Sequence, residues 1–351
     1  MTTGPVHPEW PARLHVVTGK GGTGKTTVAA ALALALAAGG YRTLLVEVEG
    51  RQGIAQLFGT DPLPYEERRI ATTADGGEVR ALAVDPEQAL LEYLDRFYRL
   101  GRAGRVLRRV GAIDFATTIA PGLRDVLLTG KVKEATTRTE GGRRVYQAVV
   151  LDAPPAGRIG RFLNVTAETA KLAKVGPIRA QSEGVAALLR SPMTAVHLVT
   201  LLEEMPVQET ADTLAELRRL GLPLGRIIVN AARAPLLTQA AATAPESAAG
   251  PESAARPEPA AGAEPAAGPE PAPPSRAELS AALSSAGLPA DQAMVTGLAA
   301  EMSEYLIRER LEAALRAELA ELGRPVVELP LLPEGPDRAG LETLAAALRS
   351  A

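Results

Sequence analysis

The feature that most constrains this chain is a glycine-rich stretch near its N-terminus, Val16-Val17-Thr18-Gly19-Lys20-Gly21-Gly22-Thr23-Gly24-Lys25-Thr26-Thr27. It fits the phosphate-binding pattern G-x-x-x-x-G-K-[ST] at every position. A short apolar segment over 14–17 precedes it and an Ala/Leu-rich segment over 27–38 follows it. These segments predict strand, loop and helix in the order that the motif requires. Such a loop binds phosphate because its backbone amides converge and the following helix presents its positive end.

The residues of this loop predict how a nucleotide would be held. Lys25 supplies positive charge for the β- and γ-phosphates, and the Thr26 hydroxyl is a hard oxygen that Mg²⁺ accepts as a ligand. The glycines let the backbone turn sharply so that its amides face the phosphates. The predicted nucleotide-binding residues of the loop are Gly19, Gly21, Gly22, Thr23, Gly24, Lys25, Thr26 and Thr27.

Composition narrows the possible functions. The 351 residues carry a net charge of −3, so no overall positive field attracts nucleic acid. The absence of cysteine excludes disulfides, cysteine metal sites and thiol catalysis. Residues 1–11 lack the apolar region of a signal peptide, and no uninterrupted apolar run is long enough to span a membrane. We therefore expect a cytoplasmic protein without an integral membrane segment.

Apolar strands alternate with helices along most of the chain, which predicts a doubly wound α/β fold with a mostly parallel sheet. An inserted helical subdomain is predicted over 86–192, with one strand over 145–151 inside that range. Residues 1–12 are expected to form a loose tail. Residues 240–275 are rich in Ala, Pro, Glu and Gly and nearly devoid of large apolar side chains, so they predict a disordered insertion.

Further segments are assigned from their apolar pattern and their glycine and proline boundaries. The other predicted strands are 42–48, 78–84, 195–200, 226–230 and 325–331, and the other predicted helices include 206–220, 291–322 and 341–349. Short helical pieces are expected over 100–140, broken at Gly101, Gly111, Pro121 and Gly130.

In an open parallel sheet a ligand binds at the carboxyl ends of the strands, and further candidate residues lie there. Asp152 ends a buried strand and is the second predicted Mg²⁺ ligand, with an ordinary turn-capping role as the alternative. Glu49 follows the second strand and is the candidate to orient the attacking water, with a solvated loop acid as the alternative. An amide offers both a donor and an acceptor to a base. The residues predicted to surround adenine are Asn230, Pro330 and Leu331.

Taken together, these segments resemble the arsenical-pump and tail-anchored-protein-targeting ATPases, within the dimeric ATPases that have a deviant phosphate-binding loop. The resemblance covers most of the chain and implies a P-loop ATPase domain over 13–351. It is closer to the bacterial anion-transporting-ATPase-like branch, through Leu-Val-Glu-Val-Glu-Gly-Arg-Gln-Gly over 45–53. The segments that carry it are Gly19–Thr27, Ala120–Leu123, Asp152–Arg158, Arg161–Leu163, Ile228–Asn230 and Leu329–Leu332.

The resemblance implies a Mg²⁺-dependent ATPase that works as a homodimer or as a heterodimer with a related ATPase and controls a protein client or partner. It implies that Lys20 crosses the dimer interface to the partner's nucleotide, whereas a solvated loop lysine is the alternative from the residues alone. It also implies that residues 153–158 form a switch that responds to the γ-phosphate. The predicted catalytic residues are Lys20, Lys25 and Glu49.

Two differences from the family pattern leave other functions open. The family has Asp-Pro where this chain has Glu49-Gly50, which favours slow turnover or a regulatory, poorly hydrolysing subunit of a heterodimer. The chain also lacks the cysteines that would bind arsenite or a zinc ion at a dimer interface. A spatial regulator of the partition or septum type and a metabolic ligase are further alternatives on a similar loop.

Overall fold

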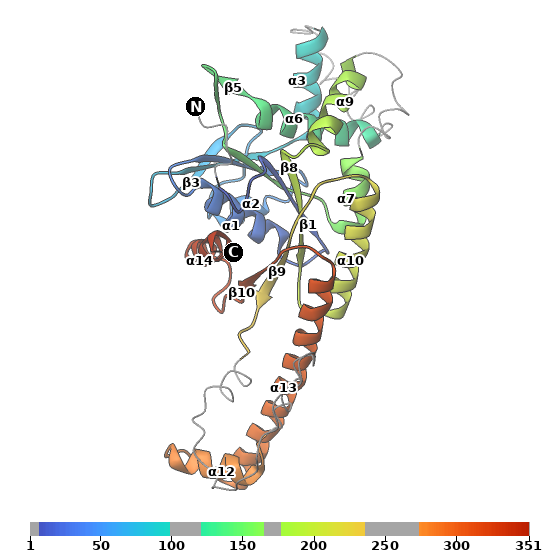
Figure 1. Ribbon diagram of the computed structural model, residues 1–351. Coiled ribbons are helices and arrows are strands. Elements are labelled where there is room, and N and C mark those ends of the chain that lie inside the picture. The colour runs from blue at the N-terminus through green and yellow to red at the C-terminus, as the bar shows by residue number, and fades with distance from the viewer. Residues whose placement is uncertain (1–6, 99–120, 165–176, 236–273, 351) are drawn as a thin grey trace, which may run out of the picture. The chain divides into compact units, whose positions relative to one another are not determined.

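The computed structural model describes residues 7–98, 121–164, 177–235 and 274–350. The chain divides into two compact units, one of residues 1–232 with 317–351 and one of residues 233–316. The first contains the sheet (Figure 1). Its strands are β1 (Leu14–Gly19), β2 (Arg42–Glu47), β3 (Arg68–Thr72), β4 (Glu78–Ala83), β7 (Ala148–Asp152), β8 (Thr194–Thr200), β9 (Leu224–Ala232) and β10 (Val326–Pro330). A short separate hairpin is formed by β5 (Thr139–Glu140) and β6 (Arg143–Arg144).

The eight strands lie in the order β10-β9-β8-β1-β7-β2-β4-β3. All neighbouring pairs are parallel except β3 with β4, so the predicted α/β fold with a mostly parallel sheet is confirmed. The edge strand β3 was not predicted, because a five-residue segment beginning Arg68-Arg69 lacks the apolar alternation of a strand. The bonds to β4, and not local pattern, hold it in the sheet.

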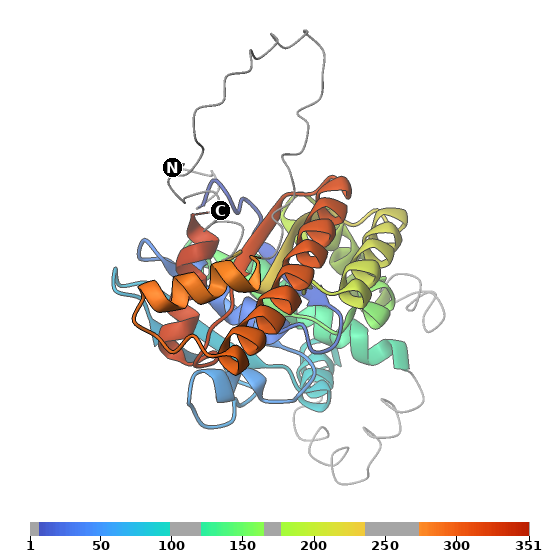
Figure 2. The ribbon, with the colours of Figure 1, turned by 90° about the horizontal axis from the view of Figure 1, so that it is seen from below.

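Helices cover both faces of the sheet in this unit. Figures 1 and 2 show α14 on one side of the strands and α10 on the other. Helix α1 is buried at every position from Val28 to Ala37, as expected for a helix enclosed by other elements. The helices described wholly within the unit are α1 (Lys25–Ala37), α2 (Gly53–Leu57), α3 (Pro86–Tyr98), α6 (Pro121–Thr137), α7 (Ala156–Leu163), α9 (Pro177–Leu189), α10 (Glu204–Arg219) and α14 (Arg338–Arg349).

Two predictions about the first unit need correction, and a third can be compared with the structure. Residues 7–12 are not a loose tail, because Trp10 is only 4% exposed and its Nε1 donates to Leu348 O at 2.9 Å. The helix α6 continues through Gly130, where a Cβ would lie 2.0 Å from Gln181 Nε2. The predicted helical subdomain over 86–192 has, where described, the helices α3, α6, α7 and α9 and the strand β7, and it belongs to the same compact unit as the sheet.

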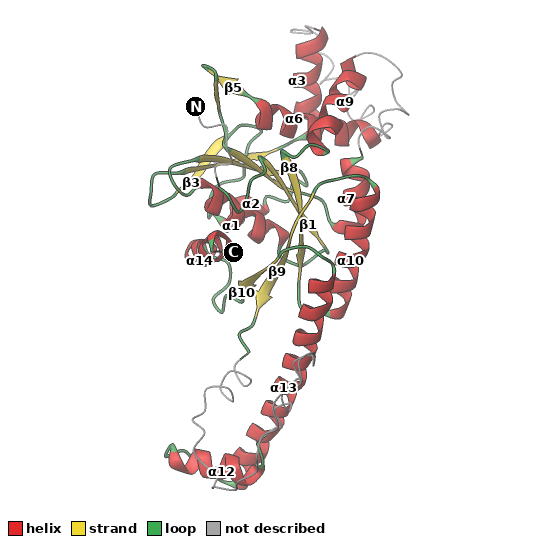
Figure 3. Cartoon of the chain, viewed as in Figure 1, coloured by secondary structure: helices red, strands yellow, loops and turns green. Residues whose placement is uncertain are grey.

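The second unit consists, where described, of helical segments and connecting chain. The helices α12 (Arg276–Ser285) and α13 (Gln292–Glu321) are drawn in red in Figure 3, and α13 continues past the unit boundary at residue 316. Ser275 caps α12 through a reciprocal capping box with Glu278. The disorder predicted over 240–275 falls outside the described residues for 240–273, and at 275 it is replaced by this cap. In the described part of the chain, every helix is too short or too polar to span a bilayer.

Candidate functional site

The phosphate-binding loop joins β1 to α1 and depends on two glycines whose surroundings leave no room for a side chain. Gly24 has φ 83°, and a Cβ at this position would lie 2.3 Å from Asn230 Nδ2. A Cβ on Gly19 would lie 2.1 Å from the carbonyl oxygen of Val199 in β8. A larger residue at position 19 would push the loop off β8, and one at position 24 would displace the Asn230 amide from its place against the loop. The fold therefore requires these glycines independently of any bound phosphate.

Hydrogen bonds within the loop and from β9 hold the loop in shape. The carbonyl oxygen of Lys20 accepts from Thr23 Oγ1 at 2.9 Å and from Lys25 Nζ at 3.2 Å. Asn230 Nδ2, near the end of β9, donates to Thr23 O at 2.9 Å. At Gly22 a Cβ would meet no atom within 4 Å. The loop is braced against β9 and has open space beside Gly22, which suits a nest for phosphate oxygens.

Thr26 and Asp152 meet at the carboxyl edge of the sheet, although 126 residues separate them in the chain. The register pairs Val17 of β1 with Asp152 at the end of β7, and Thr26 lies in the first turn of the helix that follows β1. Thr26 Oγ1 donates to Asp152 Oδ2 at 2.7 Å. The two predicted Mg²⁺ ligands are thus brought into contact by the parallel pairing of their strands.

Burial shifts the pKa values of two charged groups at this edge of the sheet, Asp152 and Lys25. Burial raises the pKa of Asp152 to about 6, a shift that Glu47 increases and that Thr26 and Lys25 oppose. Burial also lowers the pKa of Lys25, against the pull of Asp152 and Glu49. A hydroxyl and a carboxylate oxygen are the donor types that Mg²⁺ prefers, with substrate phosphates supplying further ligands. The residues present therefore fit a magnesium site, and a cation there would favour the ionised carboxylate.

The Glu49 side chain is already engaged by two arginines. Its Oε1 lies 3.3 Å from an Arg158 guanidinium nitrogen, and its Oε2 lies 3.6 Å from one of Arg51. The Glu49 side chain is 18% exposed. Arg158 belongs to α7, the helix that follows Asp152, so this ion pair joins the two loops that follow β2 and β7. The predicted role of Glu49 in orienting water stays a prediction.

Sequence reasoning missed Glu47, which shapes the loop after β2. It lies opposite Asp152 in the register and is 3% exposed. Its Oε1 accepts from the backbone amide of Gln52 at 2.5 Å, and its Oε2 accepts from that of Ile54 at 3.3 Å. Gln52 has φ 58°, a left-handed conformation that these bonds help to hold. The available signal was a carboxylate at the end of an otherwise apolar strand.

Lys20 lies beside an acid of its own chain. Its Nζ is 3.8 Å from Glu209 Oε2 of α10, and both side chains are about one-third exposed, at 30% and 34%. Its predicted action across a dimer interface stays a prediction, because the structure contains a single chain.

The remaining predicted residues lie on neighbouring elements of the same edge. Thr27 is half-buried in the first turn of α1. Pro330 pairs with Ala232 of β9, and Leu331 N donates to Ala232 O at 2.9 Å. Leu331 is 43% exposed, beside the strand that carries Asn230. Contact of these residues with adenine stays a prediction, whereas the bond from Asn230 to the loop is observed.

The fold and the loop together define a class of protein. A mostly parallel sheet, a glycine loop between its central strand β1 and α1, and a Thr–Asp pair at the carboxyl edge are the arrangement of a P-loop nucleotide-binding protein.

Comparison with known proteins specifies the family. The sequence model of the anion-transporting ATPase family matches residues 12–191. The ATPase BagA of Mycobacterium tuberculosis is 51% identical over 346 residues, which cover 97% of this chain and 94% of that protein. The arsenical pump-driving ATPase of Acidiphilium multivorum is 30% identical over 237 residues, 61% of this chain and 38% of that protein. One of Escherichia coli is 26% identical over 239 residues, with the same two coverages of 61% and 38%.

This chain belongs to the anion-transporting ATPase family. The resemblance inferred from the loop, the segment 45–53 and the strand ends is confirmed. Membership of this family supports nucleotide binding and ATPase activity as general properties.

Proposed function

We propose that this chain is a Mg²⁺-dependent ATPase that binds and hydrolyses ATP at the loop over 19–27. The observation that carries the proposal is the 2.7 Å contact between Thr26 Oγ1 and Asp152 Oδ2 at the carboxyl edge of β1 and β7. It joins a hydroxyl and a carboxylate beside an amide-lined loop, the set that P-loop enzymes use for a metal–triphosphate. When bound, Mg²⁺ neutralises charge on the phosphate oxygens.

Different residues of the chain bind the phosphates, brace the loop and promote hydrolysis. The loop amides and the α1 N-terminus bind the phosphates, and the Lys25 ammonium offsets their negative charge. Asn230 keeps the loop in its binding shape through its bond to Thr23 O. Glu49 orients the attacking water once its arginine partners shift. Lys20 leaves Glu209 and reaches the nucleotide of a second subunit, which makes hydrolysis depend on a dimer.

Residues 153–158 connect this chemistry to the rest of the fold. Thr18 Oγ1 of β1 donates to Pro154 O at 2.7 Å, and Arg158 contacts Glu49. A change at the γ-phosphate would therefore reach α7 through two contacts. We propose that this movement alters a helical surface that binds a protein partner in the cytoplasm.

Substitutions separate binding from turnover. Lys25→Ala is expected to abolish binding of Mg-ATP measured by calorimetry, and Thr26→Ala to remove most phosphate release. Thr343→Ala, an exposed threonine of α14, is the matched control and should behave as wild type. Lys20→Ala should bind Mg-ATP normally and release no phosphate. Equal turnover by that variant would refute the role across the interface, and no heat on adding Mg-ATP to folded wild-type chain would refute the whole proposal.

A second candidate function is a nucleotide-binding regulatory subunit that hydrolyses poorly and acts in a heterodimer. The observation that favours it is the pairing of Glu49 with Arg158 and Arg51, which occupies the proposed water-orienting carboxylate. Phosphate release measured for this chain alone and mixed with a related ATPase distinguishes the two functions. Turnover only in the mixture would favour the regulatory subunit.

A further inference from the structure

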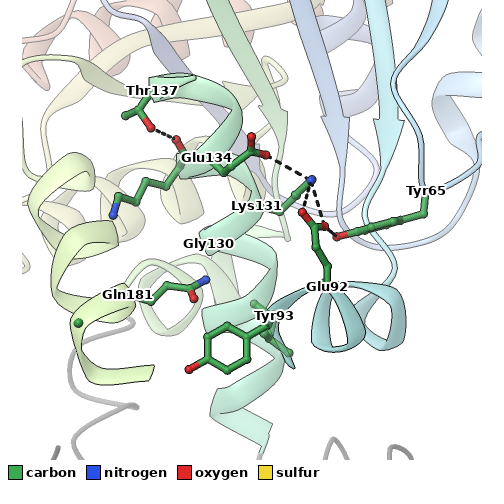
Figure 4. Close-up of a pocket in the computed structure, with 12 residues that line it drawn as sticks. Tyr65, Glu92, Tyr93, Gly130, Lys131, Glu134, Thr137 and Gln181 are labelled. Atoms are coloured by element: carbon green, nitrogen blue, oxygen red, sulfur yellow. Dashed lines mark hydrogen bonds and ion pairs between the residues drawn. The ribbon is translucent and has the colours of Figure 1, made fainter. Parts of the chain in front are cut away.

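A cavity of about 340 Å³ lies between α3, α6 and α9, and none of its lining residues belongs to the candidate nucleotide site (Figure 4). The volume is within the range of roughly 300–1,000 Å³ that small-molecule sites occupy. Ala89, Tyr93 and Leu127 give it an apolar wall, and each of them is at most 6% exposed. The other lining groups are polar and divide into two sets.

The first polar set is internally satisfied. Lys131 Nζ lies 3.0 Å from Glu92 Oε1 and 3.2 Å from Glu134 Oε2. The Tyr65 hydroxyl donates to Glu92 Oε2 at 2.7 Å. These groups bind one another, so they form a fixed wall and leave little demand for a ligand.

The second polar set consists of Lys133 on α6 and Gln181 on α9. In the described part of the chain, neither the Lys133 ammonium nor the Gln181 amide has a hydrogen-bond or ion-pair partner. In Figure 4, Gln181 lies on one side of α6, and the Glu92–Lys131 pair lies on the other. Among the described residues, the Lys133 ammonium lines the cavity with no carboxylate within ion-pair distance, so an anionic ligand could supply its partner.

Two helix-interior glycines make room for these polar groups. A Cβ on Gly184 of α9 would lie 2.2 Å from Lys133 Nζ, and a Cβ on Gly130 of α6 would lie 2.0 Å from Gln181 Nε2. Each helix thus receives the polar end of a side chain from the other helix. Glycine inside a helix destabilises the helix by about 1 kcal/mol relative to alanine. At both positions this loss of helix stability leaves space for the polar end of the neighbouring side chain.

We propose that this cavity binds a small organic carboxylate. The ligand carboxylate accepts from the Lys133 ammonium and the Gln181 amide, and its apolar body packs against Tyr93 and Leu127. Glu92 and Glu134 both bind Lys131, so Lys133 is the lining cation that can pair with the ligand carboxylate. The proposal does not depend on the nucleotide chemistry of this chain.

Ligand-observed NMR and calorimetry on the full chain test the proposal with pentanoate and phenylacetate. Their neutral amides, pentanamide and phenylacetamide, serve as ligand controls. We expect the carboxylates to bind, the amides not to bind, and Lys133→Met to weaken carboxylate binding by at least about tenfold. Gly184→Ala should also weaken binding, because its Cβ takes the space of the Lys133 ammonium. Arg179→Met removes a cation from the same helix outside the cavity and should leave binding unchanged.

Three results would overturn the proposal: no binding of either carboxylate, equal binding of acid and amide, or unchanged binding by Lys133→Met. Circular dichroism and thermal unfolding show whether each variant is folded. If Lys133→Met does not fold, Gln181→Leu decides, with a several-fold loss of carboxylate affinity supporting the site and an unchanged affinity contradicting it.

Discussion

Two buried histidines on adjacent central strands make stability fall in acid. His15 of β1 and His197 of β8 are 1% and 2% exposed, and His15 Nδ1 lies 3.1 Å from His197 Nε2. The Arg226 backbone amide donates to His197 Nδ1 at 3.0 Å, and His15 Nε2 lies 3.0 Å from Ala12 O. Because a carbonyl only accepts, His15 Nε2 carries the proton and His15 Nδ1 accepts from His197 Nε2–H. Every ring nitrogen is satisfied while both rings are neutral.

Protonation of either ring would put two donors face to face. Burial lowers the pKa of His15 to about 4 and lowers that of His197 well below its usual value, and the neighbouring ring lowers the latter further. Below the unfolded-state pKa of about 6.5, the unfolded chain binds more protons than the folded chain, so stability is lost as the pH falls. Between about pH 7.5 and pH 5, the free energy of unfolding falls by about 2 kcal/mol for each histidine.

Urea unfolding at a series of pH values measures this loss. Between about pH 7.5 and pH 5, the free energy of unfolding of His15→Gln should fall by about 2 kcal/mol less than that of wild type. This difference should hold whatever the stability of the variant at neutral pH. His7→Gln is the matched control and should keep the wild-type slope, because the His7 ring is only half-buried, with its Nε2 3.0 Å from Leu36 O. The raised pKa of Asp152 acts in the opposite direction, since its burial favours the protonated form, and this effect is common to all three chains. Equal slopes for wild type and His15→Gln would refute the reasoning.

Three further predictions concern the edge of the sheet. Glu47→Gln should lower the free energy of unfolding by about 1–3 kcal/mol in urea melts, because a single amide oxygen replaces a buried carboxylate that accepts from two backbone amides; an unchanged midpoint would contradict it. Asn230→Ala should weaken ADP binding several-fold in calorimetry by freeing Thr23 O, and full affinity would show that the brace is not needed. Glu209→Gln should change stability by less than about 1 kcal/mol, because its ion pair with Lys20 is part-exposed and long; a larger loss by thermal unfolding would contradict this estimate.

The fold class and the centre of the site could be predicted because their signals are local. The motif from Gly19 to Thr27 specifies a strand, a tight turn and a helix within a dozen or so residues, and the structure has β1, the loop and α1 in that order. Asp152 could be placed beside Thr26 because parallel strands bring their carboxyl ends to one edge. Asp85 provides another local signal, since it precedes α3 and accepts from Gln88 N at 2.8 Å through its Oδ1.

Other features had no local signal. The edge strand β3 forms by pairing with β4, and residues 7–12 are held by Trp10 against α14. The sequence predicts a helix break at Gly130, yet α6 continues through this residue. Gln181 of α9 occupies the space that a side chain at position 130 would take. In each case the contact that decides the structure comes from a distant part of the chain.

The sequence by itself determined the α/β class, the phosphate-binding loop and the residue types at its edge, because turns, caps and apolar periodicity act over a few residues. Tertiary structure alone decided which groups became partners. It brought His15 within hydrogen-bond distance of His197, paired Glu49 with Arg158, and placed Lys133 and Gln181 in the lining of one cavity. The physical reason is that burial and pairing depend on how strands and helices that are far apart in the chain pack together. A pattern of a few residues does not specify which distant elements come into contact.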